Sequence, residues 1–262
     1  MQKEVLIIIP AYNEEDSIGS FLDSILSSDA TEFADVLVIN DASSDATAKI
    51  VQSKNIAVIS HPYNLGYGTA LQTGYKYAAK NDYRYVIQID GDGQHDACNI
   101  RKIYDSLSSE NADTPTPDMI IGSRFLRDSQ SFSVSFFKKI AFRFFRTFIR
   151  LTSGQTITDP TSGLQGLSYP VFSYYSAFGN FDNNYPDANM IVQMSLLGFQ
   201  IKEIPAVMHA RTAGKSMHFG IIEPIFYMFV MIFSTANAYL RCKLHSYPIP
   251  NTLQGENNIE KK

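Results

Sequence analysis

Short apolar segments that alternate with polar turns and helical patterns constrain the fold of this chain more than any other feature. In the first half they are Val5–Ile9, Val36–Ile39, Ile56–Ile59, Tyr85–Ile89 and Met119–Ile121. Short continuous apolar runs are typical of buried parallel strands. A β-α repeat of this kind predicts a mostly parallel sheet with right-handed crossovers. We therefore expect an α/β fold, Rossmann-like, with helices flanking the sheet.

Each of these predicted strands is followed by polar residues. They are Asn13 and Glu14, Asp41, His61 and Asn64, Asp90 and Asp92, and Arg124. In open α/β sheets, ligands bind outside the carboxyl ends of the strands. The sequence therefore predicts a ligand site along one edge of the sheet.

Two carboxylates separated by one glycine follow the strand predicted at Tyr85–Ile89. Asp90 and Asp92 repel each other unless a cation or a proton lies between them. Hard oxygen ligands suit Mg²⁺ or Mn²⁺, and Gly91 and Gly93 permit a close backbone approach. A solvated Asp-Gly turn is the alternative interpretation of this motif.

Other polar residues at this edge have structural as well as functional interpretations. Asp41 is placed to accept a hydrogen bond from a nucleoside, and helix N-capping is its alternative. For Asp45 we favour capping, and we expect His61 to be structural. Gly66 and Gly68 resemble a phosphate loop, although neither a Walker motif nor a full G-x-G-x-x-G motif is present.

Composition narrows the classes of function. The formal net charge of −4 over 262 residues does not indicate nucleic-acid binding. The length suits one large domain or a domain with an appendage. Cys98 and Cys242 are the only cysteines, too few for a disulfide framework, which suits a reducing compartment. The apolar run Val5–Ile9 is too short for a signal peptide.

Four motifs together resemble a known family. They are Ile9-Pro10-Ala11-Tyr12-Asn13-Glu14, Asn40-Asp41-Ala42-Ser43, Asn64-Leu65-Gly66-Tyr67-Gly68 and Asp90-Gly91-Asp92-Gly93-Gln94-His95. Their order and spacing resemble those of inverting family-2 glycosyltransferases, in particular the polyprenyl-phosphate (dolichol-phosphate mannose synthase-like) branch. The resemblance covers about residues 4–217. It implies a GT-A fold, a nucleotide-diphosphate sugar donor and a divalent metal, Mg²⁺ or Mn²⁺.

The resemblance also implies roles for individual residues. The nucleoside would be held by Pro10, Tyr12, Glu14 and Asp41. The metal and the diphosphate would be held by Asp90 and Asp92, with Gln94 as a further metal ligand. The same donor site would include Asn64, Gly68, Gly91 and Lys215. Catalytic roles fall to Asp92, Arg124, Asp159 and Arg211.

A helix is predicted at residues 133–151, within a stretch from Ser129 to Thr158 that has no acidic residue. At 100° per residue its cations lie on one stripe, which comprises Lys139, Arg143, Arg146 and Arg150. Its apolar residues lie on the opposite face, which comprises Phe137, Ile140, Phe144 and Phe148. This pattern is typical of a helix at a membrane interface. An ordinary helix with a solvated basic face is the alternative.

Three segments of the second half depart from the family pattern. Thr158–Leu164 resembles the region that helps to hold an acceptor phosphate, but Leu164 and Gln165 stand where Phe-Arg is usual. Asp159 is an acceptor-site residue or a turn former before Pro160. The usual acid at the start of helix 188–197 is Asn189 here. Asp187 is a candidate base for a hydroxyl acceptor, with N-capping favoured instead.

The loop at residues 211–217 resembles the family's mobile Arg-x-x-Gly-x-Ser-Lys loop, with Met217 in place of the last lysine. Arg211 and Lys215 would close on the donor diphosphate, as in a lid. A solvated loop is the alternative.

The C-terminal part divides into an apolar helix at residues 218–241 and a polar tail at 242–262, after the GT-A domain at 1–217. The uncharged run Ile225–Leu240 is shorter than the roughly 20 residues that span a bilayer. We therefore expect an interfacial or partner-packed helix, with residues 219–240 contacting a second copy or a membrane partner.

The sequence favours a peripheral glycosyltransferase at the cytoplasmic face of the membrane, which transfers a sugar from a nucleotide donor to a polyprenyl phosphate. Transfer to a sugar hydroxyl, in polysaccharide or glycolipid assembly, is one alternative. Because of the residues at Gln165, Asn189 and Met217, a nucleotide-sugar-binding protein without turnover is another. The Asp90 and Asp92 pair argues against the last, because it would serve the leaving group.

Overall fold

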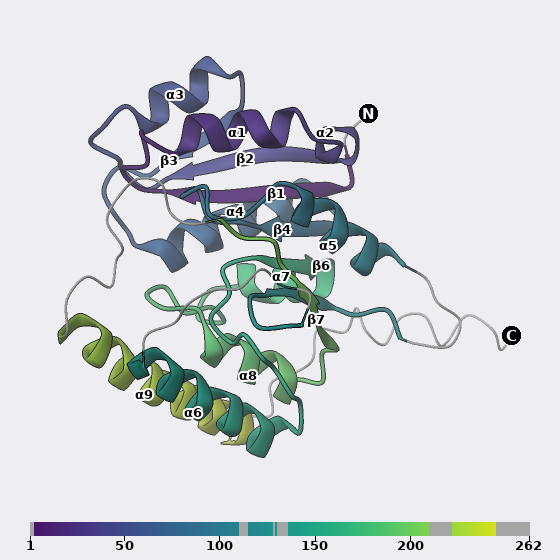
Figure 1. Cartoon of the computed structure of the whole chain (residues 1–262), viewed down its shortest axis with the longest axis vertical. Helices are drawn as coiled ribbons and strands as arrows, with labels where there is room; N and C mark the ends of the chain where they lie inside the picture. Colours follow the sequence, from purple (N-terminus) through teal and green to yellow (C-terminus); the bar gives the residue numbers. More distant parts are fainter. Residues whose placement is uncertain (1–2, 110–114, 128, 130–135, 210–221, 245–262) are drawn as a thin grey trace, which may run out of the picture.

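The computed structural model describes residues 3–109, 115–127, 129, 136–209 and 222–244. Within these residues seven strands form one sheet in the order β3-β2-β1-β4-β6-β5-β7 (Figure 1). The strands are β1 (Val5–Ala11), β2 (Ala34–Asn40), β3 (Ala57–Ser60), β4 (Tyr85–Gln88), β5 (Met119–Ser123), β6 (Gln165–Ser168) and β7 (Ile201–Pro205).

The predicted parallel arrangement is confirmed for every pairing except those of β6. Strand β6 runs antiparallel to both β4 and β5. It was not predicted because Gln165-Gly166-Leu167-Ser168 has only one large apolar residue. Its Gly166 is required by packing, since a Cβ there would lie 2.2 Å from Cγ2 of Ile103.

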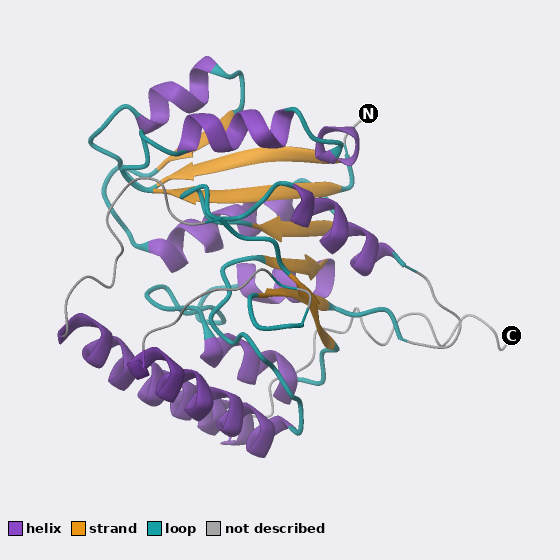
Figure 2. Ribbon diagram, viewed as in Figure 1, coloured by secondary structure: helices purple, strands orange, loops and turns teal. Residues whose placement is uncertain are grey.

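Helices cover both faces of the sheet (Figure 2). One face carries α1 (Ile18–Leu26), α2 (Ala30–Phe33), α3 (Thr47–Ser53) and α5 (Cys98–Ser108). The other carries α4 (Tyr67–Lys80), α7 (Tyr169–Ser176) and α8 (Ala188–Leu196). Strand β1 is apolar throughout, and its side chains alternate between the two faces of the sheet, so it is buried between the two helical layers. Leu6 and Ile8 join the core under α4, whereas Val5, Ile7 and Ile9 join the core under α1 and α5.

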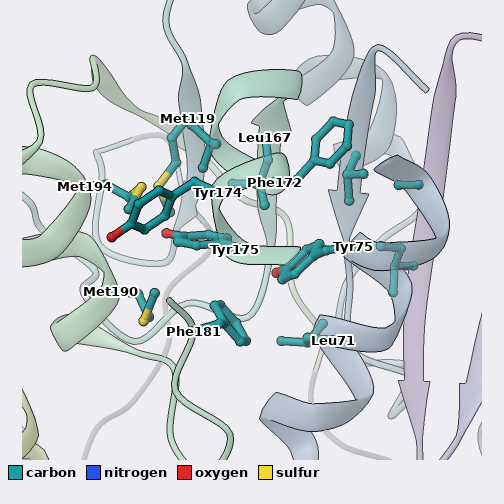
Figure 3. Close-up of a cluster of buried hydrophobic side chains, with 14 of the residues drawn as sticks. Leu71, Tyr75, Met119, Leu167, Phe172, Tyr174, Tyr175, Phe181, Met190 and Met194 are labelled. Carbon is teal, nitrogen blue, oxygen red and sulfur yellow. The ribbon is translucent and has the colours of Figure 1, made fainter. Parts of the chain in front are cut away.

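Aromatic side chains of α4, of α7 and of the loop after α7 form a buried cluster (Figure 3). This cluster supports the end of β4. The ring of Tyr75 lies 5.6 Å from that of Tyr175 and 5.2 Å from that of Phe181. The Tyr75 hydroxyl donates a hydrogen bond to Oε1 of Gln88 on β4. The Gln88 amide in turn donates to the carbonyl of Gly163, at 3.1 Å. The last residue of β4 is thereby fixed two positions before Asp90.

Two further helices, α6 (Phe136–Ser153) and α9 (Ile222–Leu244), pack against α8 on the side away from the sheet (Figure 1). Phe145 of α6 and Met231 of α9 join one buried cluster there. Helix α9 continues through Cys242 to Leu244, so it takes the first residues of the predicted tail. Residues 245–262 lie outside the described part of the chain. Among the described residues, no helix is both long and apolar enough to cross a bilayer.

The predicted division of the basic helix into two faces is corrected by its packing. Among the described side chains of α6, those of residues 142–153, Phe145 and Ile149 are fully buried, whereas Phe144 is 41% exposed. The side chains of Phe137, Lys139 and Ile140 lie outside the described ones. Arg146 turns inward, where its Nε donates to the Thr158 carbonyl at 2.6 Å and its guanidinium lies over the Phe125 ring. The buried stripe lies between the two predicted faces, on the side on which α6 packs against α8.

Candidate active site

The predicted site residues gather where the strand order reverses. From β1 the chain runs to β2 and β3 on one side, and it then returns to β4 on the other side of β1. The crevice at such a switch point is where α/β sheets bind ligands. Pro10 and Tyr12 lie at the end of β1, and Asp90 follows β4 by two residues. The Tyr12 side chain is 49% exposed.

The loops that follow β1 and β2 are tied together. Asn13 has a φ of 54°, a left-handed conformation that asparagine tolerates. Its amide donates to Oγ of Ser43 at 3.0 Å, and its Oδ1 accepts from the amide of Ser44 at 2.8 Å. The backbone amide of Glu14 donates to Oγ1 of Thr47 at 2.8 Å. These contacts hold Tyr12 and Glu14 beside the segment that begins with Asp41.

Asp41 fastens a loop and does not cap a helix. Its carboxylate is buried and accepts hydrogen bonds from the amides of Leu65 (2.9 Å) and Gly66 (2.8 Å). The His61 ring lies 2.7 Å away from it. His61 is therefore structural, as predicted. Asp45 lies one position before Ala46, the N-cap of α3, so it does not occupy the predicted capping position. Its carboxylate still supports the helix start, because it accepts from both the amide and the hydroxyl of Thr47, the first residue of α3.

The two glycines of the Asn64–Gly68 loop have local structural roles. A Cβ on Gly68 would lie 2.2 Å from the Asp182 carbonyl oxygen and 2.6 Å from that of Asn183. Gly66 has a φ of 92°, which favours glycine. Asn64 is exposed, and its Oδ1 accepts from the Gly66 amide at 3.1 Å. The loop is thus set by Asp41 on one side and by residues 182–183 on the other.

The carboxylates after β4 are held in a defined arrangement. The Tyr67 hydroxyl donates to Oδ1 of Asp90 at 2.9 Å. A Cβ on Gly163 would lie 2.2 Å from Oδ2 of Asp90, so this glycine admits the carboxylate. Oδ1 of Asp92 accepts from the Gln94 amide at 3.0 Å. Burial and the charges of Asp90 and Asp187 raise the pKa of Tyr67 well above its usual value, so the phenol stays a donor.

His95 is buried beside these carboxylates. Its Nε2 lies 4.0 Å from Oδ2 of Asp90. Burial lowers the pKa of the imidazole to about 4, although the Asp92 charge opposes the shift. The ring is therefore neutral near pH 7. His95 forms a β-bridge with Met208, and His209 donates its amide to the Gln94 carbonyl at 2.7 Å. Met208 and His209 thus lie beside the candidate metal ligand Gln94.

Arg124, which follows β5, forms a bidentate ion pair with Asp159. Both hydrogen bonds, from Nε and from Nη2, measure 2.7 Å, and the Arg124 amide adds a third at 3.0 Å. The Asp159 side chain is fully buried, whereas that of Arg124 is 17% exposed. Glu203 of β7 accepts from the Asp159 amide at 2.8 Å and so fixes the segment. Asp159 lies beneath Arg124, which it orients.

Asp187 belongs to the same electrostatic group. It occupies the N-cap position of α8, but its side chain makes no capping hydrogen bond, so the favoured capping interpretation is wrong. The Asn189 amide oxygen accepts from the backbone amides of Asp187 and Met190 instead. Burial lowers the pKa of Arg124, but Asp159, followed by Asp187 and Asp90, outweighs it and raises the pKa. The edge thus brings Asp90, Asp159 and Asp187 within electrostatic range of Arg124, and both Asp92 and Arg124 act on His95.

The oxygen atoms available at this edge fit a divalent cation that is coordinated partly by the protein and partly by a bound ligand. Among the described residues, no group of three or more His, Cys, Asp or Glu side chains is arranged to hold a metal ion. Mg²⁺ is commonly bound by one or two carboxylates together with substrate phosphates and water. Asp90 and Asp92 supply two carboxylates, and Gln94 is half-buried beside them. Among the described residues of this edge, the acidic side chains outnumber Arg124, which favours a bound cation.

Two predicted site residues lie outside the described part of the chain, and two residues that were not predicted support the site. Arg211 and Lys215 lie outside the described residues. Tyr67 and Glu203 were missed as positioning residues. Tyr67 lies inside the Asn64–Gly68 motif, which was the available signal. Glu203 lies in a strand far along the sequence, and nothing near it in sequence signals a contact with Asp159.

Comparison with known proteins identifies the family. The profile of glycosyl transferase family 2 matches residues 6–175. An uncharacterized protein of Methanocaldococcus jannaschii is 30% identical over 77% of this chain and 80% of its own length. An undecaprenyl-phosphate mannosyltransferase of Micrococcus luteus is 25% identical over 83% of this chain and 89% of its own.

A solved structure shows the same fold. Glucosyl-3-phosphoglycerate synthase from Mycobacterium tuberculosis, in complex with Mn²⁺, uridine diphosphate and phosphoglyceric acid, superposes with a TM-score of 0.65. Its sequence identity is 18%, and the match covers 92% of this chain and 78% of the other. The expected GT-A fold is therefore confirmed. With its profile match over more than half of its length, this chain belongs to glycosyl transferase family 2.

Proposed function

We propose that this glycosyltransferase moves a sugar, with inversion, from a nucleotide-diphosphate sugar to a polyprenyl phosphate at the cytoplasmic face of the membrane. The observation that carries the proposal is the pair of carboxylates Asp90 and Asp92 after β4, together with Arg124, which Asp159 holds after β5 within electrostatic range of Asp90. Two carboxylates that could bind a cation and a fixed positive charge therefore lie at one edge of the sheet. The lipid-phosphate acceptor in the name of the Micrococcus luteus relative supports the choice of acceptor.

The donor side is formed by the tied loops after β1 and β2. Pro10, Tyr12 and Glu14 would bind the nucleoside there. Asp41 would act both directly and through the loop that it fastens, because its carboxylate already holds the amides of Leu65 and Gly66. Asn64, Gly68 and Gly91 would line the path to the diphosphate, and Lys215 and Arg211 would close over it.

Asp90, Asp92 and Gln94 would hold Mg²⁺ or Mn²⁺. When bound, the ion neutralises charge on the departing nucleoside diphosphate. Tyr67 keeps the Asp90 carboxylate in one orientation, and Gly163 leaves room for it. A residue that orients a metal ligand in this way affects how tightly the site binds its cation.

The acceptor side is formed by Arg124 on its Asp159 support. A lipid phosphate is already an anionic nucleophile, so its oxygen attacks the anomeric carbon without a strong general base. The sugar–diphosphate bond breaks as the new bond forms on the opposite face. Arg124 orients the acceptor phosphate electrostatically, and because its guanidinium is fixed in advance, little reorganisation is needed during the reaction.

The test is a radiolabelled-sugar screen of uridine and guanosine diphosphate sugars, with and without a short-chain polyprenyl phosphate. We expect sugar transfer from one of the donors, and we expect it only when both the lipid phosphate and a divalent metal are present. Transfer to sugar hydroxyls but not to the lipid phosphate would overturn the proposed acceptor. Nucleotide binding without transfer to any acceptor would favour the non-catalytic alternative.

A second candidate, transfer to a sugar hydroxyl, is supported by Asp187. A hydroxyl acceptor requires a general base, and the Asp187 carboxylate lies within electrostatic range of Arg124 and Tyr67 without capping α8. The two candidates are separated by Asp187→Asn. This variant abolishes transfer to a hydroxyl acceptor and largely spares transfer to a phosphate acceptor.

Tyr67→Phe is expected to raise the metal concentration needed for half-maximal transfer by about 10- to 100-fold, because it removes a hydrogen bond that orients a proposed metal ligand. The measurement is a titration of transfer rate with Mn²⁺. Tyr63→Phe is the matched control, since Tyr63 lies just before the same loop and is 67% exposed. An unchanged metal requirement in Tyr67→Phe would remove Tyr67 from the site.

A further inference from the structure

Helix α9 exposes a stripe of large apolar side chains, which the exposed Asn237 interrupts between Phe233 and Leu240. Phe229, Phe233, Leu240 and Leu244 are 55%, 73%, 51% and 76% exposed, respectively. Their spacing of four, seven and four residues places them on one side of the helix. The stripe extends over about 22 Å at 1.5 Å per residue. The opposite side of α9 is buried, with Met231 and Thr235 almost inaccessible.

Helix α6 continues this surface. It lies alongside α9 (Figure 1), and the ring of its Phe148 is 6.3 Å from that of Tyr239. Phe144 and Leu151 are 41% and 81% exposed on the same side of α6. We call the six exposed side chains the outer face, which comprises Phe144, Leu151, Phe229, Phe233, Leu240 and Leu244.

All charged side chains that are described in α6 and α9 are positive. Residues 142–153 and 229–244 contain no aspartate or glutamate. Arg143, Arg150 and Lys243 are exposed there. Contiguous exposed apolar surface on a soluble domain marks an interaction site. A complementary partner is apolar at its centre and negatively charged at its rim, as an anionic bilayer is.

We propose that the outer face docks on an anionic lipid bilayer, an inference that rests on the proposed function because the acceptor there is a lipid. The apolar side chains enter the interface, and the three cations contact headgroups. A second copy of the chain is disfavoured as the occupant. A two-fold contact would bring the cations of both copies together with no acid in these segments to pair with them.

Docking at this face would hold the site in a fixed position relative to the membrane. Ser234 of α9 donates to Asp182 at 2.8 Å, and the Asp182 carbonyl lies against Gly68. The Asn189 side chain of α8 donates hydrogen bonds of 2.7 Å to the Asp182 carboxylate and to the Ser234 hydroxyl. The docked helices are therefore fixed to the loop whose Tyr67 holds Asp90.

The test compares the wild-type chain with Phe233→Ser/Leu240→Ser by sedimentation with vesicles of phosphatidylglycerol and phosphatidylcholine. We expect salt-sensitive binding of the wild type. The partition coefficient of the double variant onto the vesicles should be about 100-fold lower, because burial of one such side chain changes this coefficient by roughly a factor of ten. Leu26→Ser on α1, where Leu26 is 41% exposed, is the matched control and should bind like the wild type.

Two further measurements separate the possible occupants and the two proposals. Sedimentation velocity reports oligomeric state, and a wild-type dimer that the double variant dissociates would overturn bilayer docking in favour of a second copy. Transfer to a long polyprenyl phosphate in vesicles should fall in the double variant, while transfer to a short-chain acceptor persists. Short-chain transfer by a wild type that binds no vesicles would overturn docking and leave the proposed function intact.

Discussion

Asp92→Asn is expected to reduce sugar transfer by about a thousandfold while the fold stays intact. The carboxylate is proposed to hold the cation that stabilises the leaving diphosphate, a contribution of several kcal/mol, and each 1.36 kcal/mol corresponds to about tenfold in rate. Asparagine keeps an oxygen that accepts the Gln94 amide, as Asp92 does. The measurement is the initial rate at saturating donor and Mn²⁺, with urea unfolding as the check on stability.

Asp105→Asn is the control for loss of one negative charge. Asp105 is exposed on α5 and pairs only across one turn with Arg101, so the rate should not change. Removal of the metal with excess chelator should reproduce the Asp92→Asn result in the wild type. Full activity in chelator, or a wild-type rate in Asp92→Asn, would refute the metal assignment.

Asp159→Ala is expected to lower the free energy of unfolding by about 3–5 kcal/mol, because it leaves the largely buried Arg124 without its partner. Asp159 is fully buried and accepts three hydrogen bonds from Arg124. Transfer should also fall, since the guanidinium loses its orientation. Equilibrium unfolding in urea measures the first effect, and the rate at saturating donor measures the second.

The surface pair of Arg101 and Asp29, joined at 3.3 Å with both side chains about half exposed, provides the matched control. Asp29→Ala should cost no more than about 1 kcal/mol. Replacing both buried partners, in Arg124→Leu/Asp159→Leu, should cost less stability than Asp159→Ala alone, yet transfer should stay low. A loss below about 1 kcal/mol in Asp159→Ala would show that the pair does not organise the segment.

The charge arrangement explains why the two variants should behave differently. Asp92 is half-buried at the crevice, so its loss changes what the site binds while leaving the core untouched. Asp159 lies beneath Arg124, where its loss leaves a charge in a poorly solvated environment. Asp92→Asn therefore tests the chemistry, and Asp159→Ala tests the scaffold of the acceptor side.

The sequence by itself determined the parallel core and the edge on which the site lies. Strands β1, β2 and β4 have apolar runs that alternate with helical patterns, and the topology of such a repeat is restricted by right-handed crossovers. The polar residues after each strand consequently meet at one edge, where Tyr12, Asp90 and Arg124 lie. Local patterns suffice for these features because they depend only on periodicity and chain connectivity.

Only the tertiary structure decided which side chain acts on which. Strand β6 exists because β4 and β5 accept it, not because its own residues form an apolar run. For Asp159 the sequence left open an acceptor-site residue or a turn former, and the fold buries its side chain beneath Arg124. The rotation of α6 that buries Phe145, rather than Phe144, follows from its contact with α8. Such outcomes depend on contacts between distant segments, which no local pattern encodes.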